Sequence, residues 1–134
     1  MYIPESHRIF PDPDDTSRIM RTIDELGKVD IAFGGIGING HLAFNEAEDV
    51  SAKEFALRET RVLEISRETR VANAIGDLNG AIDAMPKYAV TIGMREILSA
   101  RKVVIGVFRP WHRAVLREAL FAPVSGHFPA TLLQ

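Results

Sequence analysis

The feature that most constrains how this chain folds is a glycine-rich loop placed directly after a short apolar strand. Residues 29–33 predict a buried strand, and residues 34–46 follow with four glycines, then His41 and Glu46. Glycine permits backbone conformations closed to other residues and lets a ligand approach the chain closely. Open parallel sheets bind their ligands where loops leave the carboxyl ends of the strands. The loop therefore predicts an α/β fold with a ligand site at the end of this strand.

Predicted strands and helices alternate along the rest of the chain, which favours an α/β fold with a largely parallel sheet. Three or four strands are few for such a sheet, so we expect a single domain over residues 1–134 with an incomplete sheet. The predicted strands are 29–33, 61–65, 88–92 and 102–108. Four helices are predicted. The first is capped at Asp14, Asp15 or Thr16 and ends at Gly27, and the second runs from Ser66 through Ile75. The third covers residues 94–100, and the fourth begins at Pro110. Residues up to Asp15, 47–57, 76–86 and the tail from Pro123 read as loop.

Composition and charge exclude several classes of function. The formal net charge is −2, so there is no basic field to recruit nucleic acid. No apolar run approaches the roughly 20 residues that span a bilayer, and the start of the chain lacks the pattern of a signal peptide. The chain has no cysteine, which excludes disulfides and thiolate chemistry. We therefore expect a cytoplasmic protein with no nucleic-acid or membrane partner.

The glycine loop admits more than one interpretation. Gly35, Gly37 and Gly40 match the spacing of a dinucleotide fingerprint, but residues 41–45 do not continue as an amphipathic helix. A different small-molecule site is therefore favoured over a nicotinamide or flavin site, and a tight turn without ligand is the alternative. No metal site is expected, because His41 and Glu46 lack a third potential ligand nearby.

His41 and Glu46 form a candidate catalytic pair. A carboxylate beside an imidazole suits general acid–base chemistry near neutral pH, although a structural loop histidine with a surface glutamate is the alternative. Arg109 and Arg113 lie at the start of the last predicted helix, where guanidinium groups suit a phosphate or carboxylate. A solvated basic face is the alternative there. The other three histidines are expected to be structural.

Residues 33–46 resemble the glucosamine-6-phosphate deaminase/isomerase family. The resemblance continues through residues 69–73, 85–93 and 129–134, in the family's order. It implies a Rossmann-like three-layer sandwich with a mostly parallel sheet, and an enzyme of amino-sugar catabolism, with hydrolase and isomerase character, that converts an amino-sugar phosphate to a ketose phosphate and ammonia without a cofactor.

The resemblance also implies roles for single residues. His41 would assist opening of the sugar ring, Glu46 would orient it and balance its charge, and position 39 would complete the relay. The residues expected to bind the sugar phosphate are Gly35, Gly37, Gly40, Arg113 and, next after it, Arg109.

This sequence departs from the family at three points. Asn39 stands where an aspartate is expected, and Ile75 where an arginine would hold the substrate phosphate. The chain matches only the later part of the family, so the base that removes the C2 proton is not identified. Three hypotheses follow: an amino-sugar-phosphate deaminase, a noncatalytic sugar-phosphate-binding module, or a related lactonase or isomerase. A missing N-terminal half or a homo-oligomer would complete the sheet.

Overall fold

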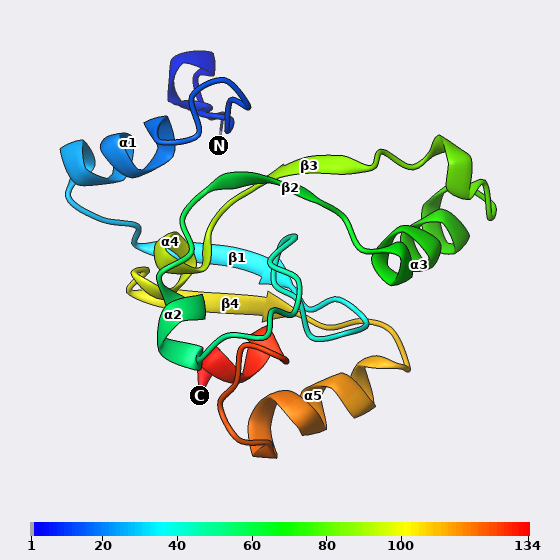
Figure 1. Cartoon of the computed structure of the whole chain (residues 1–134). Coiled ribbons are helices and arrows are strands. Elements are labelled where there is room, and N and C mark those ends of the chain that lie inside the picture. The colour runs from blue at the N-terminus through cyan, green and yellow to red at the C-terminus, as the bar shows by residue number, and fades with distance from the viewer. Residues whose placement is uncertain (1) are drawn as a thin grey trace.

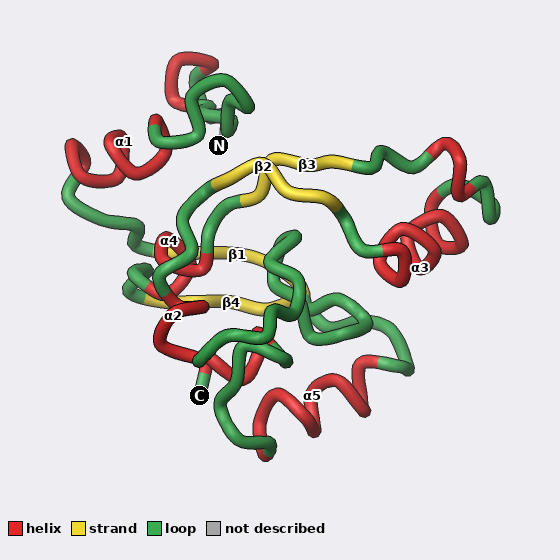
Figure 2. The backbone as a smooth tube through the Cα atoms, in the orientation of Figure 1, coloured by secondary structure: helices red, strands yellow, loops and turns green. Residues whose placement is uncertain are grey.

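The computed structural model describes residues 2–134 and confirms a mixed α/β fold with a parallel strand pair (Figures 1 and 2). Helices and strands alternate over most of the chain, as the sequence predicts. The α-helices are α1 (Arg18–Leu26), α2 (Ala52–Ala56), α3 (Arg67–Asp77), α4 (Met94–Leu98) and α5 (His112–Phe121). The strands are β1 (Ile31–Gly35), β2 (Arg61–Glu64), β3 (Tyr88–Thr91) and β4 (Lys102–Gly106). Short 3₁₀ segments are η1 (Glu5–His7), η2 (Ile82–Ala84) and η3 (Pro129–Leu133).

The four strands form two separate pairs. β1 pairs with β4 in parallel, from Ile31 opposite Lys102 to Gly35 opposite Gly106. β2 pairs with β3 antiparallel, from Arg61 opposite Thr91 to Glu64 opposite Tyr88. In Figure 1 the β2–β3 ribbon arches over β1 and leads to α3 at its far end. The antiparallel pair adds to the predicted parallel arrangement, and it places α3 beyond the end of the ribbon.

The hydrophobic core lies where the loop after β1 meets α2, α4, α5 and η3. Phe55 and Met94 are fully buried, and Leu42 is 2% exposed. Ile36 and Leu42 come from the glycine loop itself, so the loop is part of the core and is not a free surface segment. No helix within residues 2–134 is long and apolar enough to cross a membrane.

Three local predictions are corrected by the structure. The residue that caps α1 is Ser17, and no side-chain hydrogen bond caps that helix; Asp15 instead binds Arg21 and Ser17 through its carboxylate. Residues 47–57 were predicted irregular, yet α2 forms there, because Ser51 and Glu54 make a reciprocal capping box. The tail, predicted as loop, contains η3, which packs on α5.

Candidate functional site

A cavity of about 700 Å³ opens at the carboxyl ends of β1 and β4. The loop after β1 supplies one wall with Gly35, Gly37 and His41, and the segment after β4 supplies another with Arg109. One face of α3 closes the third side. Ligands bind at this end of parallel strands in open α/β sheets, so the cavity lies where the sequence predicts a site.

His41, Asn39 and Glu46 form a continuous hydrogen-bonded relay at this cavity. Nδ1 of His41 lies 2.6 Å from Oδ1 of Asn39, and Nδ2 of Asn39 donates to Oε2 of Glu46 at 2.9 Å. The direct separation between His41 Nδ1 and Glu46 Oε2 is longer, at 3.9 Å. Asn39 therefore links the two titratable groups, because its amide accepts on one side and donates on the other.

The relay assigns the tautomer of His41. The backbone N–H of His41 also points to Oδ1 of Asn39, at 3.4 Å, which identifies that atom as the amide oxygen. An oxygen can only accept, so Nδ1 of His41 carries the proton and donates it. Nε2 then has a free lone pair, and no residue among those described accepts from it or donates to it.

Burial keeps His41 in its neutral form. The pKa of His41 lies below its usual value of 6.5, first because burial disfavours the imidazolium, while the Glu46 carboxylate offsets part of that effect. The side chains of His41 and Glu46 are only 11% and 15% exposed. Near neutral pH His41 is therefore a neutral imidazole joined to Glu46 through the Asn39 amide, and His41 Nε2 is available as a base.

The glycine loop has this shape because its backbone folds tightly on itself. The N–H of Gly37 donates to the carbonyl of His41, and that of Gly40 to the carbonyl of Gly37. Gly40 has φ +80°, and a Cβ there would lie 2.5 Å from the Phe128 ring. A Cβ at Gly37 would lie 2.0–2.5 Å from the His41 ring. Both glycines are thus required for packing: Gly40 against Phe128, and Gly37 against the imidazole.

The end of the loop is anchored to β3 by buried polar groups. Asn45 is fully buried, and its Nδ2 donates to the carbonyls of Leu42 and Ile92. The N–H of Phe44 donates to the hydroxyl of Thr91. The bonds from Asn45 to Ile92 and from Phe44 to Thr91 each join residues 47 positions apart in sequence, so they fix His41 and Glu46 relative to the β2–β3 ribbon.

The structure brings only some of the predicted substrate-binding residues to the cavity. Gly35, Gly37 and Arg109 line it, while Gly40 and Arg113 do not. Arg113 is exposed on α5, whereas the guanidinium of Arg109 lies beside α3, because a Cβ added at Gly76 would be 3.3 Å from its Nη1.

Sequence reasoning missed the face that α3 presents to the cavity. Thr69, Asn73 and Asp77 line the cavity at a spacing of four residues, and Oγ1 of Thr69 lies 3.4 Å from His41 Nδ1. That spacing places polar side chains on one helix face, a signal that was available in the sequence. Asp77 is the one carboxylate among the described residues that line the cavity.

His112 also lines the cavity, but its two ring nitrogens are occupied by the backbone. Nδ1 accepts from the N–H groups of Phe108 and Arg109, at 3.2 and 3.0 Å, and Nε2 then donates to the carbonyl of Ile36 at 3.1 Å. This histidine therefore ties the segment after β4 to the glycine loop, in keeping with the structural role that the sequence suggests for it.

The fold and the site together define a Rossmann-like α/β protein with a histidine relay at the carboxyl ends of its parallel strands. No family model matches the chain. It is 38% identical over 114 residues to a glucosamine-6-phosphate deaminase of Clostridium beijerinckii and 34% identical over 114 residues to that of Lachnoclostridium phytofermentans, covering 84% of this chain and 44% of each relative. It is 35% identical over 116 residues to glucosamine-6-phosphate deaminase 1 of Bacillus subtilis, covering 87% of this chain and 45% of that relative.

A solved structure described as a monomeric glucosamine-6-phosphate deaminase of the NagB superfamily superposes with a TM-score of 0.82 and 32% identity. The match covers 97% of this chain and 54% of that one. The chain therefore belongs to the glucosamine-6-phosphate deaminase family. It spans about half the length of the relatives that it matches.

Proposed function

We propose that this chain carries the ring-opening site of an amino-sugar-phosphate deaminase acting on glucosamine 6-phosphate or a close analogue. The observation that supports this most is the relay from Glu46 through Asn39 to His41, with His41 Nε2 free at a cavity large enough for a sugar phosphate. In this proposal Nε2 takes the proton of the anomeric hydroxyl and delivers it to the ring oxygen as the C1–O5 bond breaks. Asn39 and Glu46 hold the imidazole in the tautomer that this transfer needs.

Arg109 is the proposed phosphate ligand. Ile75 lines the cavity where the resemblance expects an arginine, and the guanidinium of Arg109 lies over the adjacent Gly76. A guanidinium suits phosphate because it offers paired donors in one plane. Gly35 and Gly37 line the cavity beside the strand end, while Gly40 and Arg113 contribute only indirectly.

Arg109 and Arg113 form a matched pair for testing this assignment. Arg109→Ala is expected to weaken binding of glucosamine 6-phosphate about tenfold or more, because a charge-assisted contact is lost. Arg113→Ala is expected to bind as the wild type does. Calorimetric titration with glucosamine 6-phosphate, and with glucosamine as the control lacking phosphate, separates the two; equal losses in both variants would contradict the assignment.

Ring opening can be measured without the later steps of deamination. Exchange NMR on glucosamine 6-phosphate reports how fast its two anomers interconvert, and this interconversion passes through the open chain. The wild-type chain should accelerate it, and His41→Gln should remove about 10²–10⁴-fold of that acceleration, the usual contribution of a general acid–base group. His127→Gln is the control, because that histidine is exposed and its ring pairs with Asp49. Wild-type exchange at the uncatalysed rate would refute the proposal.

Noncatalytic binding of a sugar phosphate is the second candidate, and Asn39 in place of an aspartate favours it. Anomer exchange decides between the two, because deamination also needs a base for the C2 proton, which is not identified in this chain. Release of ammonia by the chain would exclude the binding module, whereas tight binding without anomer exchange would support it. The proposal also includes a cytoplasmic location, a reaction of the hydrolase class and the formation of a homo-oligomer.

A further inference from the structure

Thr69, on the face of α3 that lines the cavity, is buried against the ring of His41. The residue is 1% exposed, and its Oγ1 lies 3.4 Å from His41 Nδ1. Within residues 2–134, this is the one hydrogen bond between α3 and the glycine loop. A buried hydroxyl needs a hydrogen-bond partner, and the imidazole is the partner that this hydroxyl has.

The start of α3 holds the Thr69 hydroxyl in place. Ser66 caps the helix, and its side chain accepts from the N–H of Thr69 at 3.1 Å. A threonine hydroxyl inside a helix commonly turns back to a carbonyl three or four residues earlier. At Thr69 the hydroxyl instead contacts the imidazole. The capped first turn of α3 therefore presents a hydroxyl to His41.

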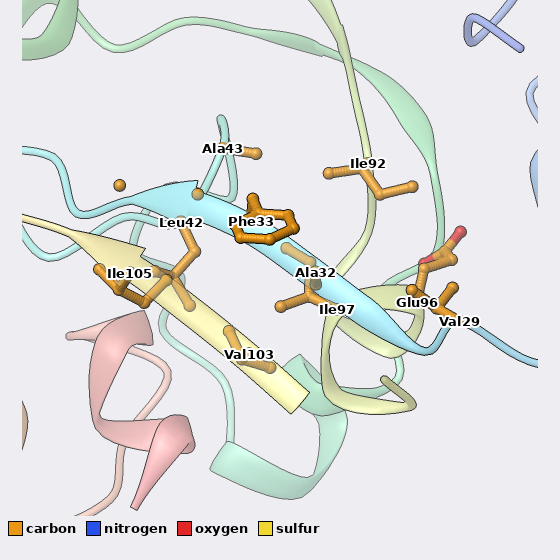
Figure 3. Close-up of a pocket in the computed structure, with 12 residues that line it drawn as sticks. Val29, Ala32, Phe33, Leu42, Ala43, Ile92, Glu96, Ile97, Val103 and Ile105 are labelled. Atoms are coloured by element: carbon orange, nitrogen blue, oxygen red, sulfur yellow. The ribbon is translucent and has the colours of Figure 1, made fainter. Parts of the chain in front are cut away.

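The backbone on either side of His41 is fixed independently of the ring. Leu42 is 2% exposed in the core, and Figure 3 shows it beside Ile105 at the ends of the strand pair. Gly40, on the other side of His41, packs closely on the Phe128 ring. Only the side-chain torsions can then move the imidazole, so the contacts that the ring makes determine its orientation.

Two oxygens lie beside Nδ1 of His41. Oδ1 of Asn39 is 2.6 Å away, and Oγ1 of Thr69 is 3.4 Å away. Because Nδ1 carries the proton, both oxygens accept from the same N–H, in a three-centre hydrogen bond. A ring turned by half a rotation would place a carbon beside both oxygens. The two acceptors therefore favour the orientation in which Nδ1 faces the relay and Nε2 faces the cavity.

We propose that Thr69 is a positioning residue of the ring-opening site: its hydroxyl shares the Nδ1 proton of His41 with Asn39 and so keeps Nε2 directed to the cavity. Both acceptors also stabilise the imidazolium that forms when Nε2 takes up a proton, because the Nδ1–H then carries part of the charge. The second acceptor matters in this chain because Asn39 is a neutral amide. This inference rests on the proposed ring opening, and it gives α3 a role in orienting the base.

Thr69→Val and Thr69→Ser form a matched pair, because the first variant removes the hydroxyl and the second keeps it. NMR of the labelled wild-type chain should show the His41 Nδ1 proton protected from exchange with solvent. Thr69→Val should accelerate that proton exchange about two- to tenfold, the effect of one hydrogen bond. It should lower kcat for anomer exchange of glucosamine 6-phosphate by a similar factor and leave KM unchanged. Thr69→Ser should keep the wild-type values of all three, even though it loses a buried methyl group.

Thr60→Val is the control for the loss of a buried threonine hydroxyl outside the cavity. Thr60 is 5% exposed, and its hydroxyl donates to Oε1 of Glu96 at 2.7 Å. This variant should be less stable than the wild type, while its His41 proton exchange stays unchanged. A loss of protection in Thr60→Val equal to that in Thr69→Val would overturn the inference, because it would show a general effect of destabilisation.

A double-mutant cycle with Asn39→Ala tests whether the two oxygens share one proton. Thr69→Val should accelerate proton exchange more in the Asn39→Ala background than in the wild type, because Thr69 is then the remaining acceptor. Equal effects in both backgrounds, or a Thr69→Val spectrum equal to that of the wild type, would overturn the inference. If the wild-type chain does not accelerate anomer exchange, the ring-opening proposal fails, and the proton-exchange measurement still decides whether Thr69 holds the imidazole.

Discussion

Replacing Gly37 by alanine tests how closely the loop backbone supports His41. The added Cβ would lie 2.0 Å from Cε1 and 2.1 Å from Nε2 of the imidazole. An ordinary carbon–carbon contact is about 3.5–4.0 Å, so the ring must retreat by about 1.5 Å. A shift of that size breaks the 2.6 Å hydrogen bond to Asn39.

Two magnitudes follow from that displacement. Loss of the hydrogen bond should lower the free energy of unfolding by about 1 kcal/mol. Displacement of a catalytic group by about 1 Å costs on the order of 10²-fold in rate, so anomer exchange of glucosamine 6-phosphate should fall by at least that factor. Gly37→Ala should thus reduce the rate of anomer exchange more severely than it reduces the free energy of unfolding.

Nitrogen NMR of the labelled imidazole measures the cause directly. In the wild-type chain the Nδ1–H tautomer should dominate at neutral pH, and in Gly37→Ala that preference should be lost. Gly34→Ala is the steric control, because a Cβ there meets Ile105 at an ordinary 3.7 Å. An unchanged His41 spectrum in Gly37→Ala would refute the argument that this glycine makes room for the ring.

Three further predictions follow from the same geometry. Asn39→Asp places a carboxylate beside His41 Nδ1 and should raise the pKa of His41, which NMR titration of its ring protons measures; an unchanged or lower value would contradict the relay. Because the folded-state pKa of His41 is lowered, its contribution to stability should be fully present above pH 6.5 and be lost as the pH falls through that value toward the folded pKa. Urea unfolding across this range should therefore depend less on pH in His41→Gln. Phe55→Ala should destabilise the fold by about 3–5 kcal/mol in urea, since Phe55 is fully buried, whereas Phe121→Ala should change it by less than about 0.5 kcal/mol.

The sequence predicted the parts of this structure that depend on local patterns. The strand predicted at 29–33, the helix capped by Ser66 and the strand predicted at 102–108 follow from short-range signals, and the structure confirms that each element exists. Two bounds are wrong: β1 runs from Ile31 to Gly35 and so includes the first two glycines, and β4 ends at Gly106. The antiparallel pairing of β2 with β3 does not follow from short-range signals, because the path of the chain between two strands sets their relative direction. The alternating burial along β2 agrees with a sheet that is solvated on one face, a pattern more typical of antiparallel pairs.

The candidate site likewise contains residues that could be placed from the sequence alone and residues that could not. Asn39, His41 and Glu46 lie within eight residues, so their proximity could be inferred before any fold was known. Thr69 and Asp77 could not be placed there, since they reach the cavity only because the β2–β3 ribbon carries α3 beyond the strand ends (Figure 1). The family resemblance favours Arg113 over Arg109 as the phosphate ligand. The proposal reverses this order, because Arg109 lines the cavity and its guanidinium lies beside Gly76 of α3, whereas Arg113 does not line the cavity.

Asn39 is the residue whose interpretation differs most between sequence and structure. In the sequence it stands where an aspartate is expected and weakens the relay, because an amide neither takes a proton nor balances an imidazolium. In the structure the two polar atoms of its side-chain amide have different partners: the oxygen accepts a hydrogen bond from His41, and the nitrogen donates one to Glu46. An ionised aspartate cannot donate to a second carboxylate, so it would repel Glu46 where the amide joins it. The amide therefore favours a neutral imidazole with Nε2 free to accept a proton, as the proposed ring opening requires. The anomer-exchange rate measures that step alone, whereas the release of ammonia also depends on a base for the C2 proton.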